Sequence, residues 1–222
     1  MYTTESYVVT EENEDGFDAV AALVDEGERR DLFLYGASRS GKTHLLHIAK
    51  DRLGNAGMYC ATTDLILRLD LGTDDAFFDR IGAVPVLLVD AFERLFEHET
   101  APELMRLLLE ERDRLGLSTA IASRAPRAEF DLGALCEPLS KFEEVELSVL
   151  GSEGRAVAAH AVAGRYRTDV SPQFSDEAVA EIAERSETVS DVENAVQFLM
   201  AGAGLGPEAV IGADDVRRLL AR

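Results

Sequence analysis

The stretch LFLYGASRSGKTHLLH, residues 32–47, joins an apolar run to a helical pattern through the sequence Gly-x-x-x-x-Gly-Lys-Thr. Glycines at the two ends of such a loop let the backbone curl so that its N–H groups face phosphate oxygens. The lysine then reaches the β- and γ-phosphates of a nucleotide, and the next hydroxyl binds Mg²⁺. The pattern therefore predicts a phosphate-binding loop made of Gly36, Ala37, Ser38, Arg39, Ser40, Gly41, Lys42, Thr43 and His44.

A carboxylate is expected beside this loop, at the end of a neighbouring apolar strand. Asp90 ends the run VPVLLVD, residues 84–90. We expect Asp90 to hold Mg²⁺ through water, with Thr43 as the second metal-binding residue. His44 and His47 lie one helical turn apart, but no cysteine or acid stands at ligand spacing from them, so we do not expect them to ligate a metal.

Short apolar runs alternate with helical patterns over the first two thirds of the chain. The expected strands are residues 31–36, 57–61, 84–90, 118–123 and 145–149, and the expected helices are 16–27, 41–53, 62–69, 74–81 and 101–115. This alternation predicts an α/β core, residues 1–150, with a parallel five-stranded sheet flanked by helices. From there on only helices are expected, at 151–167, 175–186, 190–204 and 213–221, and they would form a small helical domain, residues 151–222.

The composition limits the classes of function. The formal charge of −20 repels phosphate backbones, so non-specific DNA binding is disfavoured. No apolar run approaches the roughly 20 residues of a membrane span, and the first residues lack a secretory signal, so we expect a cytoplasmic protein without a membrane partner. Charge alone leaves open whether the acidic surface serves solubility or adaptation to high internal salt.

The same segments resemble the AAA+ P-loop module of the DnaA family of replication initiators. The loop and its Thr-His-Leu-Leu-His helix carry the resemblance most specifically. Residues 7–13, YVVTEEN, are similar to the family's N-terminal box, which implies that Val8 and Val9 contact the adenine. Further similarity covers residues 86–95, 119–130, 134–150 and 187–199. No segment resembles the family's C-terminal DNA-binding domain, so the chain is most like the stand-alone regulatory paralogues of the Hda type.

Four positions depart from the catalytic pattern that the resemblance implies. Ala91 stands where the family has a second acid after the Asp90 equivalent, and Arg124 replaces an acid at sensor 1. Lys141 replaces the arginine finger and Glu193 the sensor 2 arginine. Glu93 and Lys141 remain weak candidates for catalytic roles. Together these departures predict weak or no intrinsic ATPase, and a glutamate near the γ-phosphate would favour ADP over ATP.

The resemblance implies an ADP- or ATP-binding protein that uses Mg²⁺ and regulates chromosomal replication initiation through protein–protein contact. The expected partner is another AAA+ replication protein, such as a DnaA-like initiator, or a second copy. The alternatives are an active DnaA-like ATPase motor and a DNA-associated loader. The residues leave open which partner binds, which nucleotide is resident, and whether the effect is activating or inhibitory.

Overall fold

The computed structural model describes residues 7–25, 29–72, 75–166, 172–202 and 209–220. The chain divides into two compact units. One comprises Met1–Tyr7 and Asn13–Ser148, and the other comprises Val8–Glu12 and Val149–Arg222. The sequence did not predict that the short stretch Val8–Glu12 belongs with the C-terminal helices. No helix among the described residues is long and apolar enough to cross a membrane.

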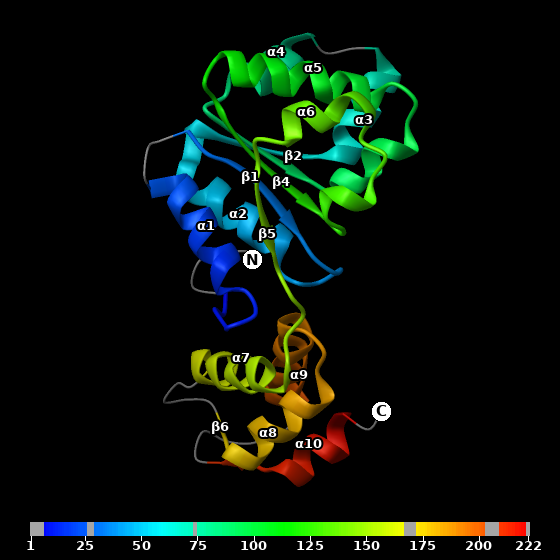
Figure 1. Ribbon diagram of the computed structural model, residues 1–222. Coiled ribbons are helices and arrows are strands. Elements are labelled where there is room, and N and C mark those ends of the chain that lie inside the picture. Colours follow the sequence, from blue (N-terminus) through cyan, green and yellow to red (C-terminus); the bar gives the residue numbers. More distant parts are fainter. Residues whose placement is uncertain (1–6, 26–28, 73–74, 167–171, 203–208, 221–222) are drawn as a thin grey trace. The chain divides into compact units, whose positions relative to one another are not determined.

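The first unit is built on a parallel five-stranded sheet in the order β2-β3-β4-β1-β5 (Figure 1), which confirms the predicted fold class. Its strands are β1 (Asp31–Tyr35), β2 (Gly57–Ala61), β3 (Val86–Asp90), β4 (Ser118–Ser123) and β5 (Glu143–Glu146). The predicted bounds of the last strand, residues 145–149, were wrong, because β5 begins and ends earlier in the chain. β5 pairs only with β1 at the sheet edge and its residues are mostly exposed, so acidic side chains are tolerated and no apolar run marks it.

Helices cover both faces of this sheet (Figure 1). One apolar cluster joins sheet residues such as Leu32 and Leu88 to the first two helices, and a second joins Phe33 and Leu87 to the others. Because successive side chains of a strand point to opposite faces, β1, β2, β3 and β4 each contribute to both clusters. The helices are α1 (Glu14–Asp25) and α2 (Lys42–Leu53) on one face, and α3 (Thr62–Leu71), α4 (Asp75–Ala83), α5 (Ala101–Arg114) and α6 (Cys136–Leu139) on the other.

One charged side chain lies inside this unit. Arg112 of α5 is 1% exposed, and its guanidinium donates to Thr119 Oγ1 at 3.0 Å and to the backbone oxygens of Ile81, Val84 and Ser118. Burial lowers the pKa of Arg112 to about 10, so it stays charged at neutral pH. The side chain therefore ties α5 to the start of β4 and to the segment before β3.

The described residues of the second unit form four helices and, contrary to the prediction of helices alone, one short parallel strand pair. β6 (Gln173–Phe174) pairs with β7 (Val210–Ile211), and each strand is too short to give an alternating pattern in the sequence. Val8 is buried in the apolar core of this unit, and Glu12 Oε1 accepts a hydrogen bond from Gly151 N at 2.7 Å. The helices are α7 (Ser152–Arg165), α8 (Asp176–Arg185), α9 (Val189–Gly202) and α10 (Ala213–Leu220).

Candidate functional site

The predicted phosphate loop follows β1 and leads into α2, at the carboxyl end of the sheet. Gly36 and Gly41 have φ angles of 148° and 101°, which favour glycine. A Cβ at Gly36 would lie 2.0 Å from the carbonyl oxygen of Leu147, so no other residue fits there without moving the backbone. Arg39 also has a positive φ, 68°, at the exposed tip of the loop, beside Ala37 and Ser38. The glycines thus permit the curled backbone that phosphate binding requires.

Lys42 lies inside this curl. Its Nζ donates to Gly36 O at 2.7 Å, to Ala37 O at 2.8 Å and to Ser40 Oγ at 3.1 Å, and the residue is only 8% exposed. Burial lowers the pKa of Lys42, while the nearby carboxylates of Glu93 and Asp90 act against that shift. The three N–H groups of the ammonium all have acceptors within the loop, so a bound phosphate would take the place of one or more of these oxygens.

The two residues predicted to hold Mg²⁺ are brought together. Thr43 Oγ1 donates to Asp90 Oδ2 at 2.8 Å, and Tyr59 donates to the same oxygen at 2.8 Å. The other oxygen, Asp90 Oδ1, accepts from the backbone N–H of Ala91 at 2.8 Å. The described residues contain no group of three or more His, Cys, Asp or Glu side chains placed to hold a metal ion. A hydroxyl and one carboxylate suit Mg²⁺ that takes its remaining ligands from phosphate and water.

An aromatic side chain that the sequence did not single out packs on the loop. Tyr7 contacts the ring of His44 edge to face, with centroids 5.1 Å apart, and stacks on Phe17. A Cβ at Gly41 would lie 3.2 Å from the Tyr7 hydroxyl, so the phenol covers this glycine directly. Val8 and Val9 belong to the other unit, where Val8 is buried and Val9 is 39% exposed. Their contact with adenine stays a prediction, and position 7 of the same YVVTEEN segment was the available signal for Tyr7.

The position after Asp90 has unusual backbone geometry. Ala91 has a φ of 57°, a left-handed conformation that costs a residue with a Cβ about 1–2 kcal/mol. It precedes the 3₁₀ helix Phe92–Glu97, which contains Glu93. Ser123 pairs with Tyr35, directly before the phosphate loop, so the residue after Ser123 and its partner Glu93 lie near the start of that loop. Glu93 is paired with Arg124, the residue that follows β4: Arg124 Nε lies 3.0 Å from Glu93 Oε1.

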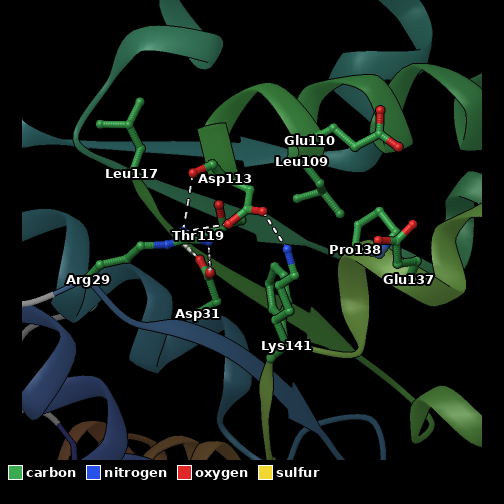
Figure 2. Close-up of a pocket in the computed structure, with 11 residues that line it drawn as sticks. Arg29, Asp31, Leu109, Glu110, Asp113, Leu117, Thr119, Glu137, Pro138 and Lys141 are labelled. Carbon is green, nitrogen blue, oxygen red and sulfur yellow. Dashed lines mark hydrogen bonds and ion pairs between the residues drawn. The ribbon is translucent and has the colours of Figure 1, made fainter. Parts of the chain in front are cut away.

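Lys141 lies at the amino ends of the strands, whereas the phosphate loop lies at their carboxyl ends. Figure 2 shows its surroundings. Its Nζ is 2.5 Å from Asp113 Oδ2, and Arg29 NH1 is 2.5 Å from Asp113 Oδ1. Arg29 precedes β1, whereas the phosphate loop follows it, so the length of the strand separates Lys141 from the loop of its own chain. Lys141 and then Arg29 lower the pKa of Asp113. These residues line a cavity of about 160 Å³.

Glu193, the residue at the predicted sensor 2 position, lies in α9 of the second unit. Its carboxylate is 3.4 Å from Arg165 NH1 of α7, so an ion pair partly neutralises it. Of the predicted site residues, the structure pairs Thr43 with Asp90 beside the loop, and it pairs Glu93 with Arg124 after the neighbouring strands β3 and β4. Lys141 lies apart from both pairs.

Comparison with known proteins places this geometry in a fold family. No family model matches the chain. The chromosomal replication initiator protein DnaA of Symbiobacterium thermophilum is 29% identical over 113 residues, which is 46% of this chain and 25% of that protein. The chain thus spans about a quarter of this curated relative.

Solved structures resemble nearly the whole chain. Domain III of the Thermotoga maritima initiation protein DnaA has a TM-score of 0.82 at 20% identity, over 99% of this chain and 95% of that one. AMPPCP-bound DnaA from Aquifex aeolicus has a TM-score of 0.81 at 21% identity, over 98% of this chain and 68% of that one. The Thermotoga maritima RuvB Holliday junction branch migration motor has a TM-score of 0.67 at 18% identity, over 100% of this chain and 72% of that one. The chain therefore has an α/β AAA+ fold, with a five-stranded parallel sheet and a helical C-terminal part, like that of DnaA domain III and RuvB.

Proposed function

We propose that this chain is a DnaA-like nucleotide-binding AAA+ module that regulates chromosomal replication initiation by contacting another AAA+ subunit in the cytoplasm, with little or no ATP hydrolysis of its own. The observation that carries the proposal is that a complete phosphate-binding loop lies beside a position that lacks the catalytic acid. The loop, Lys42 and the Thr43–Asp90 pair are ordered for a phosphate and Mg²⁺. The position after Asp90 is Ala91, which has no carboxylate.

Nucleotide binding follows from the chemistry of the loop. Lys42 supplies a desolvated positive charge, and the amino end of α2 adds backbone N–H groups that favour an anion. Thr43 and Asp90 would hold Mg²⁺, which neutralises phosphate charge when bound. The AMPPCP-bound Aquifex aeolicus DnaA, which shares this fold, supports ATP or ADP as the ligand.

The residues near Lys42, Thr43 and Asp90 support the proposal of weak ATP turnover. Hydrolysis requires an acid that orients water and cations that stabilise the transferring phosphoryl group. Ala91 supplies no acid, and Glu93 is engaged by Arg124. Loss of one positioned group of this kind commonly costs about 10²–10³ in rate.

Contact with a second AAA+ subunit is supported by the position of Lys141. Its ammonium is exposed at the sheet edge opposite the phosphate loop of its own chain. An arginine-finger role for Lys141 would therefore require release from Asp113 and a nucleotide held by another protein or another copy. The charge of −20 argues against a phosphate backbone as the main partner.

An active ATPase motor is the second candidate, and the closeness of Glu93 to Lys42 favours it. Steady-state ATP hydrolysis of the wild type and of Glu93→Gln separates the two proposals. The regulatory proposal expects slow turnover that Glu93→Gln leaves nearly unchanged, while a motor requires that the substitution abolish rapid turnover. A DNA mobility shift that survives physiological salt would instead support a loader.

A further inference from the structure

The carboxylate of Asp90 receives a hydrogen bond from a strand that carries no nucleotide-binding motif. The hydroxyl of Tyr59 on β2 donates to Asp90 Oδ2 at 2.8 Å, and Thr43 Oγ1 donates to the same oxygen at 2.8 Å. β2 and β3 are parallel neighbours in the sheet, so the fold brings Tyr59 close to Asp90 although 31 positions separate them in the chain. The proposed Mg²⁺ site therefore includes a third element, β2, beside α2 and β3.

These bonds also orient the hydroxyl of Thr43. A threonine hydroxyl has a single proton, and donating that proton to Asp90 leaves the lone pairs of its oxygen available to a cation. Asp90 accepts this proton in a fixed direction only while its carboxylate keeps its orientation. The Tyr59 hydroxyl at Oδ2 and the Ala91 N–H at Oδ1 fix that orientation, one at each oxygen. The position of the Thr43 hydroxyl thus depends on Tyr59 through Asp90.

The acceptor capacity of Asp90 fits a metal that is held through water. A carboxylate offers about four lone-pair positions. Within the described part of the chain, three are taken, by two hydroxyl donors at Oδ2 and one backbone N–H at Oδ1. Mg²⁺ gives up its waters reluctantly, and a metal-bound water needs one acceptor. The remaining position on Oδ1 can supply that acceptor without displacing Tyr59.

The ring of Tyr59 is held in turn by a histidine of α2. The imidazole of His47 stacks on it, with the ring centroids 4.4 Å apart and the ring planes inclined by 23°. His47 follows Thr43 by one helical turn, so both side chains occupy the same face of α2. The sequence alone indicated no role for His47. The structure places it against the ring whose hydroxyl bonds Asp90.

We propose that Tyr59 is a positioning residue of the Mg²⁺ site: its hydroxyl orients Asp90, its ring is held by His47, and the gain in nucleotide affinity that Mg²⁺ provides depends on both. The proposal rests on the nucleotide and Mg²⁺ binding proposed above. In this role Tyr59 contacts neither ligand and acts only through Asp90, as outer-shell partners of metal-binding carboxylates do. Loss of such a partner typically weakens metal binding about 10- to 100-fold.

The test measures the dissociation constant of ATP on the full chain, by displacement of a fluorescent nucleotide, with saturating Mg²⁺ and with a chelator. The ratio of the two constants is the gain in affinity that Mg²⁺ provides. Tyr59→Phe keeps the ring and removes the hydroxyl, so it should lower this gain about tenfold, or abolish it, and change ATP affinity in chelator less than about twofold. A side chain that supported only the folded core would change both constants alike.

The same titration tests the support from His47. His47→Ala removes the stacked ring and should lower the gain about threefold, whereas His47→Phe keeps an aromatic ring at this place and should retain the wild-type gain. Tyr35→Phe is the matched control, because the Tyr35 hydroxyl also donates to a carboxylate, that of Glu146, at 3.2 Å. It should leave the gain unchanged.

The possible results separate the inference from the function on which it rests. An unchanged gain in Tyr59→Phe, or an equal loss of ATP affinity with and without Mg²⁺, would overturn the inference while nucleotide binding stands. If His47→Phe behaves like His47→Ala, the part assigned to the stacked ring is wrong. If the wild type binds ATP equally with Mg²⁺ and with chelator, the proposed Mg²⁺ site fails, and if it binds no nucleotide, the proposed function itself fails.

Discussion

The hydroxyl of Thr43 donates a hydrogen bond of 2.8 Å to Asp90, a residue 47 positions later in the chain. This bond joins the end of the phosphate loop to the end of β3, and the parallel sheet makes it possible by placing the carboxyl ends of β1 and β3 at one edge. A second donor, the Tyr59 hydroxyl, bonds the same carboxylate oxygen. The residues proposed to hold Mg²⁺ are therefore positioned by the fold itself.

Removal of either Mg²⁺-binding group should remove the dependence of nucleotide affinity on Mg²⁺. Thr43→Ala and Asp90→Asn are expected to bind ATP equally with Mg²⁺ and with a chelator, whereas the wild type binds more tightly with Mg²⁺. Thr43→Ser keeps a hydroxyl and serves as the control. If Thr43→Ser behaved like Thr43→Ala, the hydroxyl would not be the group that matters. Titration calorimetry measures each case.

The buried Arg112 should be a major contributor to the stability of the core. Arg112→Ala leaves several backbone oxygens and Thr119 without their donor, and we expect a loss of about 3 kcal/mol or more in the free energy of unfolding. Arg114 lies on the same helix with its side chain 67% exposed, so Arg114→Ala should cost less than about 0.5 kcal/mol. Urea denaturation measures both, and equal losses would disprove the structural role.

The left-handed backbone of Ala91 predicts a substitution that stabilises the protein. Ala91→Gly removes the Cβ that makes this conformation unfavourable, and we expect a gain of about 0.5–1 kcal/mol. Ala21 lies inside α1, where the same substitution should cost about 1 kcal/mol. Thermal unfolding should therefore shift in opposite directions for the two variants. A loss for both would mean that Ala91 is not strained.

The ion pairs of Asp113 predict a dependence of stability on pH. Lys141 and Arg29 lower the pKa of Asp113 in the folded state, so their contribution is present above the ordinary carboxyl pKa of about 4 and is lost as pH falls through the folded-state pKa. Asp113→Asn should cost about 1 kcal/mol at neutral pH and progressively less toward about pH 3. Asp214, whose side chain is 99% exposed, is the control. A cost for Asp113→Asn that did not change with pH would contradict the assignment.

Much of the fold was predictable because short-range patterns determine it. The loop motif, the apolar run ending at Asp90 and the strand–helix alternation together gave the correct class of sheet. β5 was misplaced because an exposed edge strand with the sequence EEVE carries no apolar period. β6 and β7, each two residues long, give no pattern at all.

The site was predictable where one motif contains its residues and unpredictable where the fold brings residues together. Lys42 and Thr43 belong to one loop. The pairing of Glu93 with Arg124, and of Lys141 with Asp113, depends on how distant segments pack, which spacing along the chain does not reveal. For the same reason the resemblance indicated only that Arg124 replaces an acid. The structure shows that Arg124 forms an ion pair with Glu93.

The fate of ATP bound to the purified chain tests the central claim most directly. Radiolabelled ATP is mixed with excess protein and Mg²⁺, and the fractions of ATP and ADP on the protein are followed over time, with Lys42→Ala as the control that should not retain nucleotide. We predict that the wild type retains nearly all of the labelled nucleotide and that bound ATP persists for many minutes without a partner. Conversion of the bound ATP to ADP within a second would contradict the account.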